Sequence, residues 1–282
     1  MNTVLLGLSI LLGAGKNVAV KAGQRDFRGF RALAQLNAIG AAVSVGILLL
    51  WGGRLYVPNL RFLLLAAGYA GCTFASQALY AVASAGGSAT VSAQIYSFGF
   101  VLPTAFGLVW YREPLRIPAG IAVGLMAVSL ILSAPPASSG ARRSLRPAFG
   151  AMACSGAVGI LQKIFRNSAD AGEASSFLLL SFLLLAGLSA LCCMTRKAPD
   201  APHFGRTGTL LAVLIGCCTG VTNRLNLFLS GVLPSILFFP AVNGGCVLLT
   251  GLLSAILLRE RLTPRQTLGI GVGVAALACA AL

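Results

Sequence analysis

Three basic residues, Lys16, Lys163 and Arg224, lie inside long apolar runs of this sequence. A Lys or Arg at the middle of a membrane helix costs roughly 2.5–3.5 kcal/mol on insertion scales, so it requires a partner or a cavity. Ammonium and guanidinium groups pair well with carboxylates and phosphates. These cations therefore predict a site for an anionic or zwitterionic solute. The alternative is that each long side chain extends to the membrane interface.

Neutral polar residues lie in the same apolar runs as the cations. An unpaired amide in lipid costs several kcal/mol, so such groups must face a cavity or one another. The candidate solute-binding residues are Lys16, Asn17, Gln77, Tyr80, Gln94, Tyr96, Lys163, Asn223, Arg224 and Asn243, with Gln162 and Asn226 as further polar neighbours. Each neutral residue could equally bridge two helices.

Acidic residues are absent from the interior of these runs. Asp26, Asp170, Glu173 and Asp200 are expected in loops, and Glu113 and Glu260 in turns. A buried carboxylate that would bind an organic cation is therefore missing, which disfavours a cationic solute. We expect Glu113 and Glu260 to bond to the adjacent Arg112 and Arg259, or to cap their own turns. If transport is proton-coupled, the simplest proton carrier is a desolvated lysine.

The composition explains why these polar residues are unusual. The chain has 282 residues, of which 57% are hydrophobic and 10% charged, and its mean hydropathy is +0.89. Soluble proteins carry about a quarter charged residues, so this sequence predicts an integral membrane protein. The net charge of +15 lies mostly in short turns between apolar runs. We interpret it as contact with lipid headgroups and not with nucleic acid.

Ten apolar runs account for nearly the whole length. A bilayer core about 30 Å thick needs roughly 20 residues per helix, and lipid cannot satisfy an open backbone. The runs cover residues 3–22, 32–51, 62–84, 88–110, 117–134, 148–165, 175–194, 207–229, 232–258 and 264–282. The predicted fold is therefore an all-α membrane protein with ten transmembrane helices. The first run is expected to be a retained helix and not a signal peptide.

The sequence repeats itself with a displacement of 147 residues. Arg112-Glu113-Pro114-Leu115-Arg116 recurs as Arg259-Glu260-Arg261-Leu262-Thr263, and the same shift relates Lys16 to Lys163, Gln77 to Arg224, Ser88 to Ser235 and Gly124 to Gly271. This predicts two five-helix repeats, 1–140 and 141–282, with residues 135–146 as a polar, basic linker. Five crossings is an odd number, so the second repeat should be inverted, which suits alternating access.

Proline and glycine residues mark possible bends and close contacts. Pro103 lies in the fourth run, and Pro234, Pro240, Gly244 and Gly245 lie in the ninth. We expect these two helices to be kinked, either for gating, with Pro103, Pro240, Gly244 and Gly245 as hinge residues, or simply for packing. Gly120-x-x-x-Gly124 and Gly269-x-x-x-Gly273 predict close helix approach, either for packing or for dimerisation.

The sequence shows no pattern that is typical of catalysis or of metal or ATP binding. All eight cysteines lie in apolar runs without a Cys-x-x-Cys spacing, and His203 is expected in a loop. The sequence contains no recognisable nucleophile triad, metal cluster, paired catalytic carboxylates or ATP-binding loop. We therefore expect no enzyme activity, no metal and no cofactor.

Ten runs, a five-plus-five duplication and an Arg-Glu-x-Leu turn before a glycine-rich helix, at 112–132 and 259–282, characterise this sequence. In these features it resembles the EamA family of the drug/metabolite transporter superfamily. The resemblance implies a secondary transporter with a central cavity that moves a small organic solute without ATP. Family substrates include amino acids, nucleobases, sugars, phosphorylated metabolites and drugs.

The leading interpretation is a transporter of an anionic or zwitterionic metabolite in a bacterial-type cell membrane, acting as a monomer or homodimer. Its partners would be the solute and the lipid bilayer. A flippase for a lipid-linked intermediate and a non-transporting scaffold are the alternatives. Two arguments about the side of the membrane on which the termini lie disagree. Most basic residues follow odd-numbered runs, which places both termini outside. The resemblance implies cytoplasmic termini.

Overall fold

The computed structural model describes residues 2–23, 30–86, 89–114, 117–133, 141–195, 205–257 and 263–280, and the regular elements in these ranges are helices. The α-helices are α1 (Asn2–Ala22), α2 (Phe30–Leu50), α3 (Leu60–Gly86), α4 (Ala89–Ser97), α5 (Val101–Trp110), α6 (Ile117–Ser133), α7 (Ala141–Arg166), α8 (Ala174–Thr195), α9 (Arg206–Val232), α10 (Ser235–Leu257) and α11 (Pro264–Ala280). Two short 3-10 turns complete the set, η1 (Phe98–Phe100) and η2 (Ala171–Glu173).

Each of the ten expected apolar runs contains a described helix, because α4, η1 and α5 follow one another without a gap and form one segment. Seven helices in the described ranges are long and apolar enough to cross a membrane. The helical segments Ile95–Trp110 and Ile117–Ser133 are also apolar but shorter. The all-helical prediction is confirmed for the described residues, and the seven long helices are those of a multi-pass membrane protein.

The start of α7 differs from the sequence-based expectation. The apolar run was expected to begin at residue 148, but α7 begins at Ala141 and has Pro147 inside it. Arg142, Arg143 and Arg146 therefore belong to the first turns of a helix and not to a linker. Hydropathy marks where a helix becomes apolar, whereas backbone hydrogen bonds can extend it further through polar residues.

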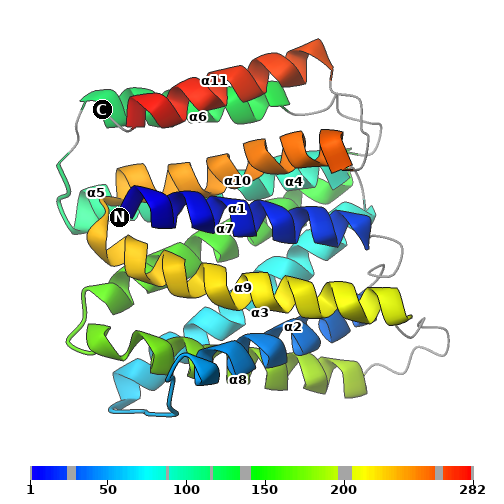
Figure 1. The fold of residues 1–282 in the computed structure, drawn as a ribbon, viewed down its shortest axis with the longest axis vertical. Coiled ribbons are helices and arrows are strands. Elements are labelled where there is room, and N and C mark those ends of the chain that lie inside the picture. The colour runs from blue at the N-terminus through cyan, green and yellow to red at the C-terminus, as the bar shows by residue number, and fades with distance from the viewer. Residues whose placement is uncertain are drawn as a thin grey trace.

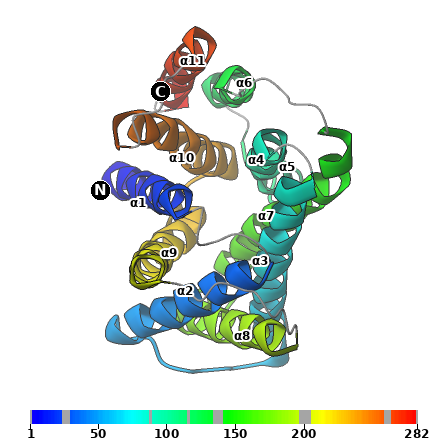
Figure 2. The same cartoon turned by 90° about the vertical axis from the view of Figure 1, so that its right-hand side faces the viewer.

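The helices form two columns that stand side by side in Figure 2. The α9 column contains α1, α9, α10 and α11, and the α3 column contains α3, α4, α5, α6 and α7. The α2 and α8 helices pack together at one end of the columns, and α6 packs on α11 at the other. In Figure 1, the start of α1 and the end of α11 lie on the same side of the molecule.

Each column combines helices from both halves of the sequence. The α1 helix packs against α9 and α10, whereas α7 packs against α3, α4 and α5. The first helix of each half has thus joined the third and fourth helical segments of the other half. Neither half forms a column from its own helices alone.

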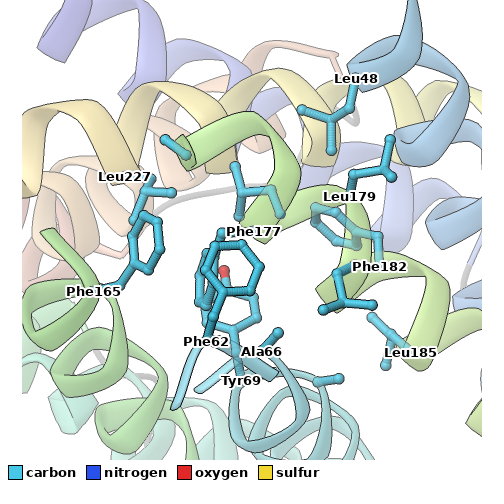
Figure 3. Packing of buried hydrophobic residues seen from close by; sticks show 14 of the residues in the cluster. Leu48, Phe62, Ala66, Tyr69, Phe165, Phe177, Leu179, Phe182, Leu185 and Leu227 are labelled. Atoms are coloured by element: carbon cyan, nitrogen blue, oxygen red, sulfur yellow. The ribbon is translucent and has the colours of Figure 1, made fainter. Parts of the chain in front are cut away.

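An aromatic core joins α3, α7 and α8 at the end where α2 and α8 lie (Figure 3). The Phe165 and Phe177 rings stack with centroids 4.0 Å apart, and Phe62 meets both of them edge-on at 5.8 and 5.9 Å. The Tyr69 ring packs edge-on against Phe177 at 5.7 Å. Stacked and edge-on aromatic pairs stabilise a core beyond the area that they bury.

The fourth helical segment is interrupted, as expected from Pro103. The 3-10 turn η1 (Phe98–Phe100) separates α4 from α5, three to five residues before this proline. Proline lacks the N–H that would bond to the carbonyl of Gly99, so the helix loses an α-type hydrogen bond there. The Thr104 side chain donates to the Phe100 carbonyl at 2.8 Å and satisfies the neighbouring acceptor.

The ninth apolar run behaves differently. Pro234 precedes α10 instead of bending it, and its carbonyl accepts the N–H groups of Leu237 and Phe238 at 3.0 and 2.9 Å. Pro234 therefore begins the helix, and the expected kink of this run stays a prediction for the residues within α10. Pro240 lies within α10, which continues through it.

Gly244 and Gly245 lie where α10 meets two other helices. A Cβ atom at Gly244 would strike the Met126 side chain of α6, and one at Gly245 would come within 2.9 Å of Ile10 in α1. Both glycines therefore permit close packing in this conformation. A hinge role for Pro103, Pro240, Gly244 and Gly245 stays a prediction.

The two Gly-x-x-x-Gly motifs are not equivalent. In α11, a Cβ at Gly273 would strike Leu248 and Ser129, and Ser129 Oγ donates to the Gly269 carbonyl at 2.6 Å. This motif packs closely, as expected. In α6, a Cβ at Gly124 would meet nothing within 4 Å, so this glycine makes no close approach within the described part of the chain.

This contrast gives a stability prediction. We expect Gly273→Ala to lower the free energy of unfolding by about 1–3 kcal/mol, because the added methyl group overpacks the contact between α11 and its neighbours. Gly124→Ala is the matched control and should be neutral or stabilising by up to about 1 kcal/mol, since alanine favours the helix. Thermal unfolding in detergent compares the two. Equal losses would contradict the close packing at Gly273.

Candidate functional site

Two hydrogen bonds connect polar side chains of α1 to the second half of the chain. Ser9 Oγ donates to Asn226 Oδ1 of α9 at 2.5 Å, and Asn17 Nδ2 donates to Thr250 Oγ1 of α10 at 3.3 Å. These bonds satisfy groups that would be costly in lipid. The polar face of α1 is therefore directed toward α9 and α10 within the α9 column.

A second polar network crosses between the columns. Gln162 Nε2 of α7 donates to Tyr69 Oη of α3 at 3.2 Å, and Tyr69 Oη donates to Asn223 Oδ1 of α9 at 2.6 Å. Asn223 Nδ2 in turn donates to the Thr219 carbonyl at 2.9 Å. Tyr69 is only 2% exposed, so the network lies inside the bundle.

Tyr69→Phe tests the energetic value of this network. It removes the hydroxyl that links Gln162 to Asn223, and we expect the free energy of unfolding to fall by about 1 kcal/mol, within the range measured for hydrogen bonds between membrane helices. The exposed Tyr56→Phe is the control and should change little. A double-mutant cycle with Asn223→Ala would contradict the link if the two losses simply added.

Lys163 is buried and fully paired. Its Nζ lies 2.6 Å from Glu113 Oε1, and it donates to the carbonyls of Ser230 at 3.1 Å and Leu233 at 3.5 Å. A lysine ammonium has three N–H donors, and these three acceptors match them. Lys163 therefore finds its partners inside the bundle, close to the end of its helix. In this conformation no donor of Lys163 remains for a solute.

Glu113 has different partners from those expected. Its carboxylate accepts the Ser235 N–H at 2.5 Å and the Ser235 hydroxyl at 3.2 Å, in addition to the Lys163 ion pair. It thus caps the first turn of α10 and not its own turn. At the start of α10, its negative charge also complements the helix dipole. Within the described residues, no ion pair joins Glu113 to Arg112. Its repeat mate, Glu260, lies outside the described residues.

The backbone around Glu113 is shaped to reach these partners. Arg112 adopts a left-handed conformation with φ of 50°, which is unusual for a residue with a side chain. The chain reverses there, and the Glu113 N–H bonds back to the Gly107 carbonyl at 3.3 Å. A Cβ atom at Gly107 would strike Ser235, so this glycine allows α5 to approach the start of α10.

Lys16 and Arg224 are the other two cations of the apolar runs. Lys16 is half-buried on α1, within electrostatic range of Cys218 on α9 and Cys246 on α10. Arg224 is half-buried on α9, within electrostatic range of Arg166. Among the described residues, neither side chain has a hydrogen bond or an ion pair. Within the described part of the chain, these two positive charges thus lack an anionic partner.

The remaining candidates divide into separate sites. Tyr80 and Tyr96 pack together with ring centroids 5.1 Å apart, which brings α3 and α4 into contact. Gln77 Oε1 is buried without a hydrogen-bond partner in the described part of the chain. Asn243 Nδ2 donates to the Phe239 carbonyl of its own helix at 2.9 Å. The side chain of Gln94, on α4, lies outside the described residues.

The structure thus unites Asn223 with Tyr69 and Gln162, and Tyr80 with Tyr96, while Lys163 belongs to a separate ion pair. The sequence-based site omitted Tyr69, Ser9 and Thr250, although each bonds to a polar residue on another helix. Tyr69 precedes Thr73 by four residues and Gln77 by eight, a spacing that places all three on one face of α3. This helical periodicity is the signal that could have identified Tyr69.

Comparison with known proteins supports the fold. No family model and no curated protein matches the chain. Among the solved structures, 27 chains match. One, described only as "Crystal structure of protein", has a TM-score of 0.77 and 16% sequence identity, and the match covers 99% of this chain and 96% of that one. At this identity the likeness establishes the fold alone.

Proposed function

We propose that this protein is a secondary transporter that moves a small anionic or zwitterionic metabolite across a cell membrane by alternating access, as its resemblance to the EamA family implies. The observation that carries the proposal is the presence of Lys16 and Arg224 in the adjacent helices α1 and α9, without a described anionic partner. A desolvated cation favours an anionic group of a bound solute, such as a carboxylate or phosphate.

The arrangement of helices supports the two-repeat part of the proposal. Adding 147 to the bounds of α6 (Ile117–Ser133) gives those of α11 (Pro264–Ala280). The same shift places α3 within one residue of the bounds of α9, and places α1 at 149–169, where it overlaps α7. The packing of α1 on α9 mirrors that of α7 on α3. Two equivalent sets of helices can exchange conformations about an axis between them, which is how inverted repeats produce alternating access.

The experiment uses purified full-length protein. A thermal-shift screen against amino acids, organic acids, sugar phosphates and nucleobases identifies stabilising compounds, and solute counterflow in proteoliposomes then tests transport. We expect stabilisation and counterflow with a compound that carries a carboxylate or phosphate. Stabilisation by a lipid phosphate alone would indicate a flippase, and no response to any compound would indicate a non-transporting scaffold. Either result would contradict the proposal.

A further inference from the structure

The ion pair of Lys163 and Glu113 connects elements that are distant in the sequence. Glu113 follows α5 and Lys163 lies on α7, so both belong to the α3 column. Ser235 begins α10, and the Ser230 and Leu233 carbonyls close α9, so these groups belong to the α9 column. The contact therefore holds the two columns together at the end where α9 turns into α10 (Figure 1).

We propose that Glu113, Lys163 and Ser235 form a latch that keeps this end of the bundle closed, and that the latch must open during the transport cycle. The inference rests on the proposed function and adds residues that position the columns without contacting the solute. In the closed state, Glu113 accepts from Lys163 at 2.6 Å and from the Ser235 N–H at 2.5 Å. The Lys163 and Glu113 side chains are only 7% and 13% exposed.

An ion pair suits a contact that must break reversibly. A buried ion pair stabilises a fold little compared with apolar residues of similar volume, because both ions lose their hydration when they are buried. When water enters, the ions recover that hydration, so opening costs less than exposing an equal apolar surface. A permanent contact between columns would be made more stably by apolar side chains, of the kind that join α3, α7 and α8 in the Phe62, Phe165 and Phe177 cluster.

The sequence repeat provides a second argument. The shift of 147 relates Lys163, Glu113 and Ser235 to Lys16, Glu260 and Ser88, so all three residue types recur. Ser88 and Glu260 lie outside the described residues, whereas Lys16 is described and forms no ion pair with another described residue. If the ion pair of Lys163 and Glu113 served only to stabilise the fold, nothing would require the same three residue types to recur in the other half. Alternating access requires each end to close in turn, and so gives each half a use for such a set.

The test measures how accessible each end is to water. In a background without the eight native cysteines, Ser230→Cys reports on the latch end. Ala83→Cys, at the position related to Ser230 by the shift of 147, reports on the opposite end of the bundle. Both native residues are 0% exposed. The rate at which a water-soluble maleimide labels each cysteine is measured on purified protein in detergent, without solute.

Glu113→Gln removes the charge of the latch while keeping its shape. We expect labelling at Ser230→Cys to accelerate by about tenfold or more, because the closed end now opens more often. Labelling at Ala83→Cys should stay constant or slow down. Glu173→Gln is the matched control, since it breaks the exposed ion pair with Arg54 at 3.5 Å, and should leave both rates unchanged.

A second variant opens the latch without changing its polar groups. Gly107→Ala places a methyl group against Ser235 and should accelerate labelling at Ser230→Cys in the same selective way. Parallel acceleration at both cysteines would mean a loosened fold and would overturn the latch, as would unchanged rates in both variants. Because no solute is used, a selective response together with failed transport would refute the proposed function and still show that this contact closes one end of the bundle.

Discussion

Glu113→Ala is expected to lower the free energy of unfolding by about 3–5 kcal/mol, the cost of leaving one member of a buried ion pair without its partner. The Lys163 ammonium would keep only the carbonyls of Ser230 and Leu233, and α10 would lose the cap at Ser235. Reversible unfolding in mixed micelles measures the loss.

Two controls define what the result means. Arg54→Ala removes an exposed ion pair, in which the Arg54 side chain is 76% exposed, and should cost no more than about 1 kcal/mol. The double variant Glu113→Ala with Lys163→Met removes both charges, and should be more stable than Glu113→Ala alone. If Glu113→Ala cost no more than Arg54→Ala, the ion pair would contribute no more than a surface contact.

Lys16→Gln is expected to weaken the binding of the transported solute by about 10- to 150-fold, which corresponds to losing a charged hydrogen bond worth about 1.5–3 kcal/mol. The substitution keeps a polar side chain on α1 but removes the positive charge opposite an anionic group. The dissociation constant of the best compound from the stabilisation screen measures the effect, and counterflow should fall in parallel.

Lys21→Gln is the matched control for this prediction. Lys21 lies in the last turn of the same helix and is exposed, so its replacement should leave solute binding unchanged. If Lys16→Gln bound the solute as tightly as the unmodified protein, Lys16 would not belong to the site. If both variants weakened binding equally, the effect would be a general one of surface charge.

The helices could be predicted from the sequence because the requirements of lipid are strict. A run of about 20 apolar residues has no other way to satisfy its backbone groups, so hydropathy alone located each described helix within several residues. It misplaced the start of α7, since Arg142 and Arg146 lie on helical turns that need not be apolar. The bounds of polar helical ends depend on hydrogen bonds, which hydropathy does not report.

The candidate site could be predicted only in part, because its partners come together through tertiary structure. Glu113 and Ser235 are separated by 122 residues and Tyr69 and Asn223 by 154, so no local pattern joins them. Lys163, Glu113 and Ser235 each belong to a pair related by the shift of 147, and they are neighbours in the structure, although the sequence predicted no contact among them. Identical glycine spacings, in contrast, hid the difference between Gly124 and Gly273, which depends on the helix that faces each one.

The packing of α1 against α9 and α10 of the second half has a consequence for the synthesis of the protein. The bonding partner of Ser9 on α9 lies 217 residues further along the chain, so α9 emerges from the ribosome about 10–40 s after α1 at typical rates of synthesis. During that interval, the polar groups of Ser9 and Asn17 are without the partners that they have in the finished protein. The polar groups of α1 therefore reach their bonding partners only after α9 and α10 have been synthesised.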